Sequence, residues 1–283
     1  MNAPQDDSPK IYLLPNLMTA GNLFSGFAAS LLIVKGTLAM ETGESLIAYF
    51  NQSYFHLAIG LILIACIFDM LDGRLARLGG HESAFGREFD SLGDVISFGV
   101  APALLLYKIV LQSFDYGWIV SFLYLLCGAM RLARFNCMAA TSHGADKDFR
   151  GFPIPAAAGV IASVTLFILW WEDQDRELTG GWRYLLLALM IFLSFMMFSK
   201  FKYPSFKAFN WRTQGSIFKF ICIFLLLIFT GLKYMWMPAV LFISYLLYGF
   251  LRPFLSLRMR QEIEEEAQEE ESGSGAEPPK NEP

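Results

Sequence analysis

The chain has 283 residues, of which 55% are hydrophobic and 27 are Phe, and its formal net charge at pH 7 is −4. A soluble domain of this length cannot bury so much apolar surface, so the composition excludes an ordinary globular protein and predicts an integral membrane protein. We expect a lipid bilayer as its environment and no nucleic acid among its partners.

Hydropathy predicts eight transmembrane helices, and therefore an all-α membrane fold. The candidate spans cover residues 13–34, 54–76, 90–111, 116–138, 152–171, 184–199, 215–232 and 234–251. Several apolar runs are shorter than the ~20 residues that a spanning helix needs, because the second, third and fourth spans continue into polar ends that face the protein interior. The first ten residues are polar and the first span lacks a small-residue cleavage site, so we expect no cleaved signal peptide.

The first span carries a polar stripe. Asn16, Thr19 and Asn22 follow one another at intervals of three residues on a helix that is otherwise apolar. Two interpretations fit this stripe: contacts with a substrate, and hydrogen bonds between helices that hold the bundle together.

Four aspartates lie in the run DMLDGRLARLGGHESAFGREFDSLGD, residues 69–94, which joins the second span to the third. On helices this run forms two stripes of acidic and small residues. One stripe comprises Asp69, Asp72, Gly73 and Ala76, and the other comprises Gly86, Asp90 and Asp94. If the stripes face each other, we expect the two backbones to approach closely and the four carboxylates to surround one point, as a hard divalent cation requires.

Ion pairing is the alternative interpretation of these acids, since Arg74, Arg77 and Arg87 lie in the same run. Each acid costs about 3 kcal/mol to insert into hydrocarbon, so intramembrane acids usually face a protein interior and carry function. Arginine pairing explains one or two of the acids, but not the glycines that lie one helical turn away on the same faces. We therefore favour a metal site.

The run also resembles the signature of a known enzyme family. Eight of its residues fill the pattern DxxDGxxARx8GxxxDxxxD without a departure: Asp69, Asp72, Gly73, Ala76, Arg77, Gly86, Asp90 and Asp94. This pattern is similar to the signature of the CDP-alcohol phosphatidyltransferases. The resemblance implies transfer of a phosphatidyl group from CDP-diacylglycerol to an alcohol, and it implies homodimers.

The chemistry of such a transfer assigns roles to these residues. Phosphoryl transfer from a diphosphate needs cations, a base for the attacking hydroxyl and in-line positioning. We expect Asp69, Asp72 and Asp90 to bind two divalent ions, Mg²⁺ or Mn²⁺, about 4 Å apart. Asp94 is expected to touch the second ion and to accept the proton of the alcohol as the catalytic base. The family resemblance implies that CDP-diacylglycerol contacts Thr19, Asn22, Gly73, Arg77, Ser83 and Gly86.

Two later segments bear on the acceptor alcohol. MRLARFN (130–136) and DFRGFPIPAAAG (148–159) resemble segments of the integral-membrane phosphatidylserine synthases within this family. The resemblance implies L-serine, whose carboxylate suits an arginine fork. The candidate serine-binding residues are Arg131, Arg134, Asn136 and Arg150. Each arginine could instead be an ordinary positive flank of a span.

Loop charge predicts the orientation. Basic residues gather before the first span, after the eighth, and between spans two and three, four and five, and six and seven, whereas the alternate loops are acidic or nearly uncharged. Both termini and the acidic run are therefore expected at the cytoplasmic face of the cell (inner) membrane.

The domain boundaries follow from these patterns. We expect a polar segment at 1–10, a membrane domain at 11–255 and a disordered acidic tail at 256–283, since the last 23 residues hold nine acids and one lysine. Other acceptors remain as alternatives, namely choline, glycerol phosphate or inositol phosphate. A cation transporter is disfavoured, because its acids would lie in both halves of an inverted repeat rather than on one pair of helices.

Overall fold

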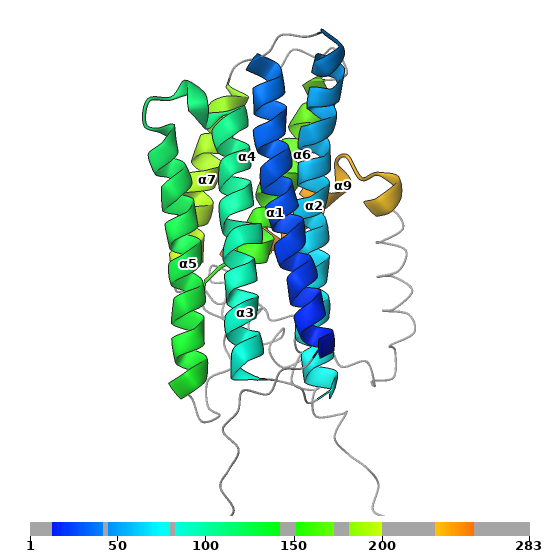
Figure 1. The fold of residues 1–283 in the computed structure, drawn as a ribbon. Coiled ribbons are helices and arrows are strands. Elements are labelled where there is room, and N and C mark those ends of the chain that lie inside the picture. The colour runs from blue at the N-terminus through cyan, green and yellow to red at the C-terminus, as the bar shows by residue number, and fades with distance from the viewer. Residues whose placement is uncertain are drawn as a thin grey trace, which may run out of the picture.

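A computed structural model of the chain describes residues 13–41, 45–79, 83–141, 151–172, 181–199 and 230–251, and within these ranges it contains helices and no strand (Figure 1). The helices are α1 (Leu13–Glu41), α2 (Ser45–Gly79), α3 (Ala84–Asp94), the π-helix η1 (Val95–Val100), α4 (Ala101–Ile109), the short 3-10 helix η2 (Leu111–Ser113), α5 (Gly117–Thr141), α6 (Ile154–Glu172), α7 (Trp182–Phe198) and α9 (Met237–Leu251). The all-α prediction is confirmed for these residues.

Five helical stretches of the described residues are long and apolar enough to cross a membrane, and they comprise Leu13–Leu38, Tyr54–Gly73, Ala84–Ile109, Gly117–Met138 and Ile154–Trp171. Helices α7 and α9 are apolar but shorter, and most of the predicted span 215–232 lies outside the described ranges. The third stretch begins before residue 90, the predicted start, because Ser83 caps α3. Its backbone is extended, and its hydroxyl accepts a hydrogen bond from the Gly86 N–H at 3.0 Å.

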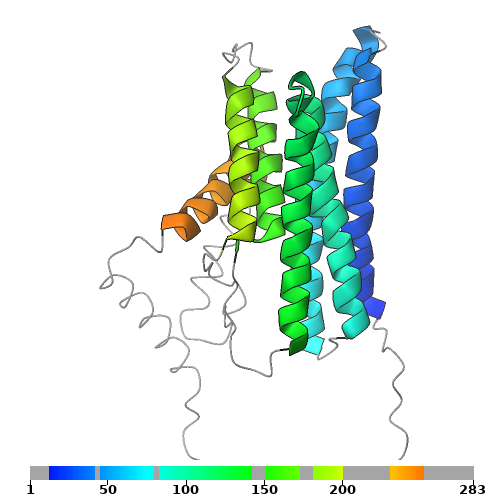
Figure 2. The ribbon, with the colours of Figure 1, turned by 90° about the vertical axis from the view of Figure 1, so that its left-hand side faces the viewer.

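Helix α6 forms the centre of the bundle. It packs against α2, α4, η1 and α9, and every residue from 157 to 166 is buried. Small residues such as Ala157, Ala158 and Gly159 let its neighbours approach closely, which suits this central position. In Figure 2 the lower ends of α1, α2, α3 and α5 extend beyond those of α6 and α7. The acidic run lies on this extended end.

The π-helix η1 follows Asp94 directly and changes the hydrogen bonding of the third stretch. Pro102 has no N–H to donate to the carbonyl of Phe98, four residues earlier. The buried hydroxyl of Tyr124 in α5 donates to that carbonyl instead, at 3.0 Å. Helix α5 is thereby tied to the stretch one turn beyond the last acid.

Helix α1 lies close against η1 because Gly26 has no side chain. A Cβ on Gly26 would overlap the backbone and side chain of Ser97. The Ser97 hydroxyl in turn donates to the Asn22 carbonyl at 2.8 Å. These contacts fix the position of the α1 polar stripe relative to the acids of α3.

Candidate functional site

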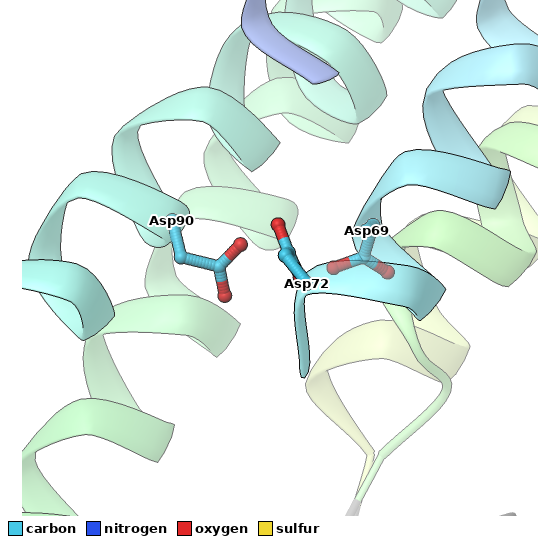
Figure 3. A group of neighbouring side chains, drawn as sticks. All are labelled: Asp69, Asp72 and Asp90. Carbon is cyan, nitrogen blue, oxygen red and sulfur yellow. The ribbon is translucent and has the colours of Figure 1, made fainter. Parts of the chain in front are cut away.

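Three of the four predicted carboxylates gather at one point between α2 and α3. Asp69 and Asp72 come from α2 and Asp90 from α3, and one oxygen of each lies within 4.8 Å of the others (Figure 3). Asp72 is only 4% exposed, and the other two are half-buried. Like charges so close together in a poorly solvated place repel one another, so the arrangement calls for a bound cation.

The residues present fit a hard divalent cation. All three side chains offer carboxylate oxygens, the ligands that Mg²⁺ and Mn²⁺ prefer. One oxygen of Asp90, Oδ1, is buried without a hydrogen-bond partner in the described structure. A buried carboxylate oxygen is costly unless it is bonded or bound to a metal, so this atom has the properties of an open ligand.

Asp94 lies apart from this group. It is 5% exposed, and its Oδ1 accepts a hydrogen bond from the Asn22 side-chain amide at 2.9 Å. It is not part of the group of three carboxylates whose oxygens lie within 4.8 Å of one another, and the arrangement of four carboxylates around one point stays a prediction.

Among the described residues, the α2 and α3 backbones do not approach each other as closely as expected. These two helices make little direct contact there, and α1 packs against both. A Cβ on Gly86 would lie close to the helix cap, 3.2 Å from Ser83 Oγ, and in ordinary contact with α1, 3.5 Å from Asn16 Oδ1. The three clustered acids therefore lie between α2 and α3, and α1 packs against both helices.

The polar stripe of α1 is bonded to the acids. The Thr19 hydroxyl lies 3.1 Å from Asp72 Oδ2 and 3.2 Å from the Pro15 carbonyl, so it donates to either acceptor. Asn22 bonds Asp94 as described, and the side-chain nitrogen of Asn16 is buried without a partner. Hydrogen bonds between helices thus account for two of the three residues, and both bonds end on predicted site carboxylates.

The other predicted CDP contacts are placed less fully. Ser83 lies at the N-terminus of α3, where its hydroxyl is engaged as the helix cap. Gly73 is half-buried and follows Asp72 directly in α2. Arg77 lies in α2, but its side chain is outside the described part of the structure.

Two of the predicted acceptor-binding residues are now placed on α5. Arg131 is half-buried, its Nε is buried without a hydrogen-bond partner, and its charge lies within electrostatic range of Asp94 and of Tyr245 in α9. Arg134 lies three residues further along α5 and is also half-buried. Arg150 is outside the described residues.

Asn136, the remaining acceptor candidate, contacts α3. Its side-chain nitrogen lies 2.9 Å from Ser91 Oγ and 3.3 Å from Glu88 Oε2, which ties α5 to the helix that carries Asp90. Its Oδ1 is buried without a partner among the described residues. The side-chain nitrogen of Asn136 therefore has a structural role, and its side-chain oxygen is open to a ligand.

Sequence reasoning missed Ser97 and Tyr245. Ser97 lies three residues after Asp94, on the same helical face as the predicted stripe, so extending the stripe by one turn would have found it. Tyr245 comes from α9, more than a hundred residues from the acids along the chain, and no local pattern marks it.

Comparisons with known proteins agree with this geometry. The sequence model of the CDP-alcohol phosphatidyltransferase family matches residues 12–196, which include all four predicted acids. The CDP-diacylglycerol–serine O-phosphatidyltransferase of Helicobacter pylori is 37% identical over 243 residues, or 86% of this chain and 91% of the relative. The archaetidylserine synthase of Methanothermobacter thermautotrophicus is 37% identical over 68% of this chain and 69% of its own length. A CDP-diacylglycerol–serine O-phosphatidyltransferase of Saccharomyces cerevisiae is 38% identical over 52% of this chain and 51% of its own length.

Proposed function

This chain belongs to the CDP-alcohol phosphatidyltransferase family, and we propose that it transfers the phosphatidyl group of CDP-diacylglycerol to L-serine, giving phosphatidylserine and CMP. The observation that carries the proposal is the 37% identity, over 86% of the chain, to a CDP-diacylglycerol–serine O-phosphatidyltransferase. The cluster of Asp69, Asp72 and Asp90 supplies the chemistry that this transfer needs.

In this proposal the three clustered acids hold two divalent ions, Mg²⁺ or Mn²⁺, and Asp94 contacts the second. When bound, such ions neutralise the diphosphate and stabilise the charge that develops on the CMP leaving group. Asp69 and Asp72 approach from one helix and Asp90 from another. The diphosphate is thereby oriented between α2 and α3.

Asp94 is the proposed base for the acceptor. The serine hydroxyl oxygen attacks the phosphorus that bears the diacylglycerol, and its proton passes to a carboxylate oxygen of Asp94. The bond between that phosphorus and the oxygen shared with CMP breaks, and CMP leaves with the shared oxygen. Because Asn22 holds Oδ1 of Asp94, Oδ2 is the oxygen left to take the proton.

The substrate contacts follow the same geometry. We assign the nucleotide to the side lined by Gly73, Arg77, Ser83 and Gly86. Arg131 is the first choice for the serine carboxylate, because its Nε is buried without a partner near Asp94. Arg134, Arg150 and the open oxygen of Asn136 are further candidates for the same substrate.

The finer membrane arrangement is part of the proposal. Loop charge supports eight spans across the cell (inner) membrane, with both termini and the acidic cluster at the cytoplasmic face. Water-soluble serine and CMP would exchange at that face. The membrane domain would cover 11–255, between a polar segment at 1–10 and an acidic tail at 256–283, and family resemblance supports a homodimer.

An acceptor panel tests the proposal. Purified protein is incubated with CDP-diacylglycerol, Mn²⁺ or Mg²⁺, and one alcohol at a time: L-serine, glycerol phosphate, choline or inositol phosphate. CMP release is followed, and the lipid product is identified by mass spectrometry. We expect release that depends on serine and yields phosphatidylserine. Preference for another alcohol would overturn the serine assignment and leave the metal chemistry standing.

A further inference from the structure

Helix α1 holds the two acid-bearing helices in register. Helices α2 and α3 contact each other little, and α1 packs against both. We propose that Thr19 and Asn22 are positioning residues. They hold Asp72 of α2 and Asp94 of α3 so that the remaining oxygen of each carboxylate faces the proposed metal ions. The inference rests on the proposed metal-dependent transfer, and it gives these residues a role other than nucleotide contact.

The hydrogen bond between Asn22 and Asp94 lies where α1 packs closely against α3 and η1. Asn22 is fully buried, and its backbone carbonyl is held by Ser97, three residues after Asp94. Gly93 lies beside this amide, since a Cβ on Gly93 would be in ordinary contact with the Asn22 side-chain nitrogen at 3.7 Å. Asn22 is thus held through its backbone carbonyl by Ser97, and its side-chain N–H donates to one Asp94 oxygen.

Thr19 differs from the other hydroxyl residues of α1. The hydroxyls of Ser25, Ser30 and Thr37 donate to carbonyls four residues earlier in their own helix, at 2.8, 3.0 and 2.9 Å. The Thr19 hydroxyl also lies 3.2 Å from the carbonyl four residues earlier, that of Pro15, but in addition it lies 3.1 Å from the carboxylate of Asp72, 53 residues away in sequence. Among these four hydroxyls, only that of Thr19 is therefore shared with a site acid.

The two donors act as a pair. They lie three residues apart on α1, and each holds one oxygen of one carboxylate, with one carboxylate on each acid-bearing helix. Partners that orient metal ligands typically change metal affinity or activity 10- to 100-fold when removed. The spacing between the α2 and α3 halves of the centre is thus set by α1 rather than by direct packing of α2 on α3.

Thr19→Val tests this inference, with Thr19→Ser as the conservative variant and Thr37→Val as the matched control. Val keeps the shape of Thr and removes the hydroxyl. Thr37 lies on the same helix away from the acids, so Thr37→Val measures the effect of losing a hydroxyl that does not contact them. Mn²⁺ binding is titrated in detergent without any substrate, from the electron paramagnetic resonance signal of free Mn²⁺. We expect Thr19→Val to weaken Mn²⁺ binding about 10-fold, Thr19→Ser to restore it, and Thr37→Val to match the unmodified protein.

Asn22→Leu provides the second readout, because the side chain keeps its size and loses the amide. At saturating Mn²⁺ we expect kcat to fall about 10-fold with little change in the KM for CDP-diacylglycerol. If both variants instead raise that KM and leave Mn²⁺ binding unchanged, the residues contact the nucleotide and the inference is wrong. Absence of Mn²⁺ binding by the unmodified protein would overturn the metal proposal itself, so the two failures are distinguishable.

Discussion

Thr19 and Asn22 of α1 are buried as deeply as Ser163 and Thr165 of α6, but their side chains reach different kinds of partner. In α6, the buried hydroxyls of Ser163 and Thr165 donate to carbonyls of their own helix at 2.6 and 2.7 Å. In α1, Thr19 and Asn22 donate to acids on other helices. Burial of a polar group therefore does not by itself mark a site.

The orphaned atoms show the same contrast. Asn16 Nδ2, Asn22 Oδ1 and Asp90 Oδ1 are buried without partners, and all three lie where α1 meets the acid-bearing helices. No such atom is found on the described residues of α6. A packed helix satisfies its own hydroxyls, whereas a binding site leaves polar atoms open for its ligand. The predictions below test this difference between the two regions.

Removing a clustered acid should have the largest effect. Asp90→Asn takes an anionic ligand from a site whose cations provide most of the charge compensation, so we expect turnover to fall roughly 10³-fold or more. CMP release by purified protein measures this loss, and an unchanged thermal unfolding curve in detergent shows that the variant folds. Near-normal turnover, or full activity in excess chelator, would contradict the metal assignment.

Asp94→Asn should separate the base from the ligands. Asn keeps the size of Asp and cannot accept the acceptor proton as a carboxylate does, so we expect roughly a 10²-fold loss of turnover. Binding of Mn²⁺ and CDP-diacylglycerol should change much less than in Asp90→Asn. Equal loss of metal binding in both variants would make Asp94 a ligand first, as the four-acid arrangement predicted from sequence required.

Arg131 should affect the acceptor selectively. If its guanidinium binds the serine carboxylate, Arg131→Ala removes a charge-assisted pair of about 1.5 to 3 kcal/mol and raises the KM for serine about 10-fold or more. Arg131→Lys should recover part of this loss, because a point charge does not reproduce the planar fork. Arg183→Ala, on the exposed surface of α7, is the control. An equal rise in the KM for CDP-diacylglycerol would indicate that Arg131 binds a phosphate of that substrate instead of the serine carboxylate.

The hydroxyls of Tyr124 and Thr165, both away from the acids, should differ in how much they contribute to the free energy of unfolding. Tyr124→Phe leaves the Phe98 carbonyl without a donor, since Pro102 cannot supply one, and we expect a loss of about 1 to 3 kcal/mol in the free energy of unfolding. Thr165→Val should cost under about 0.5 kcal/mol, because the Ile161 carbonyl keeps its own helical bond. Thermal unfolding in detergent compares the two variants. Equal losses in the free energy of unfolding would show that the Tyr124 hydrogen bond stabilises the fold no more than that of Thr165.

Sequence reasoning located the acids correctly and misplaced their surroundings. The spacing of Asp69, Asp72 and Asp90 was enough to predict that their side chains meet, because helical periodicity is a local property. That α1 packs against both acid-bearing helices, and that its side chains reach Asp72 and Asp94, depends on which helices pack together. Packing between helices distant in sequence leaves no local pattern, so these features emerged only from the fold.

The polar stripe of α1 shows how far local patterns reach. Its three-residue spacing predicted a shared face, and both interpretations of that face were reasonable from sequence. The structure shows hydrogen bonds to Asp72 and Asp94, which lie 53 and 72 residues away from their partners along the chain. Only the fold identifies those partners.

The location of bound Mn²⁺ tests the central claim most directly. Anomalous diffraction at the manganese edge, from crystals grown with Mn²⁺ out of an active preparation, would place the ion independently of any lipid or acceptor. We expect an anomalous peak bounded by Asp69, Asp72 and Asp90, at the end of the bundle where α1 bridges α2 and α3. A peak elsewhere, or none at this cluster in protein that releases CMP from CDP-diacylglycerol, would contradict the account.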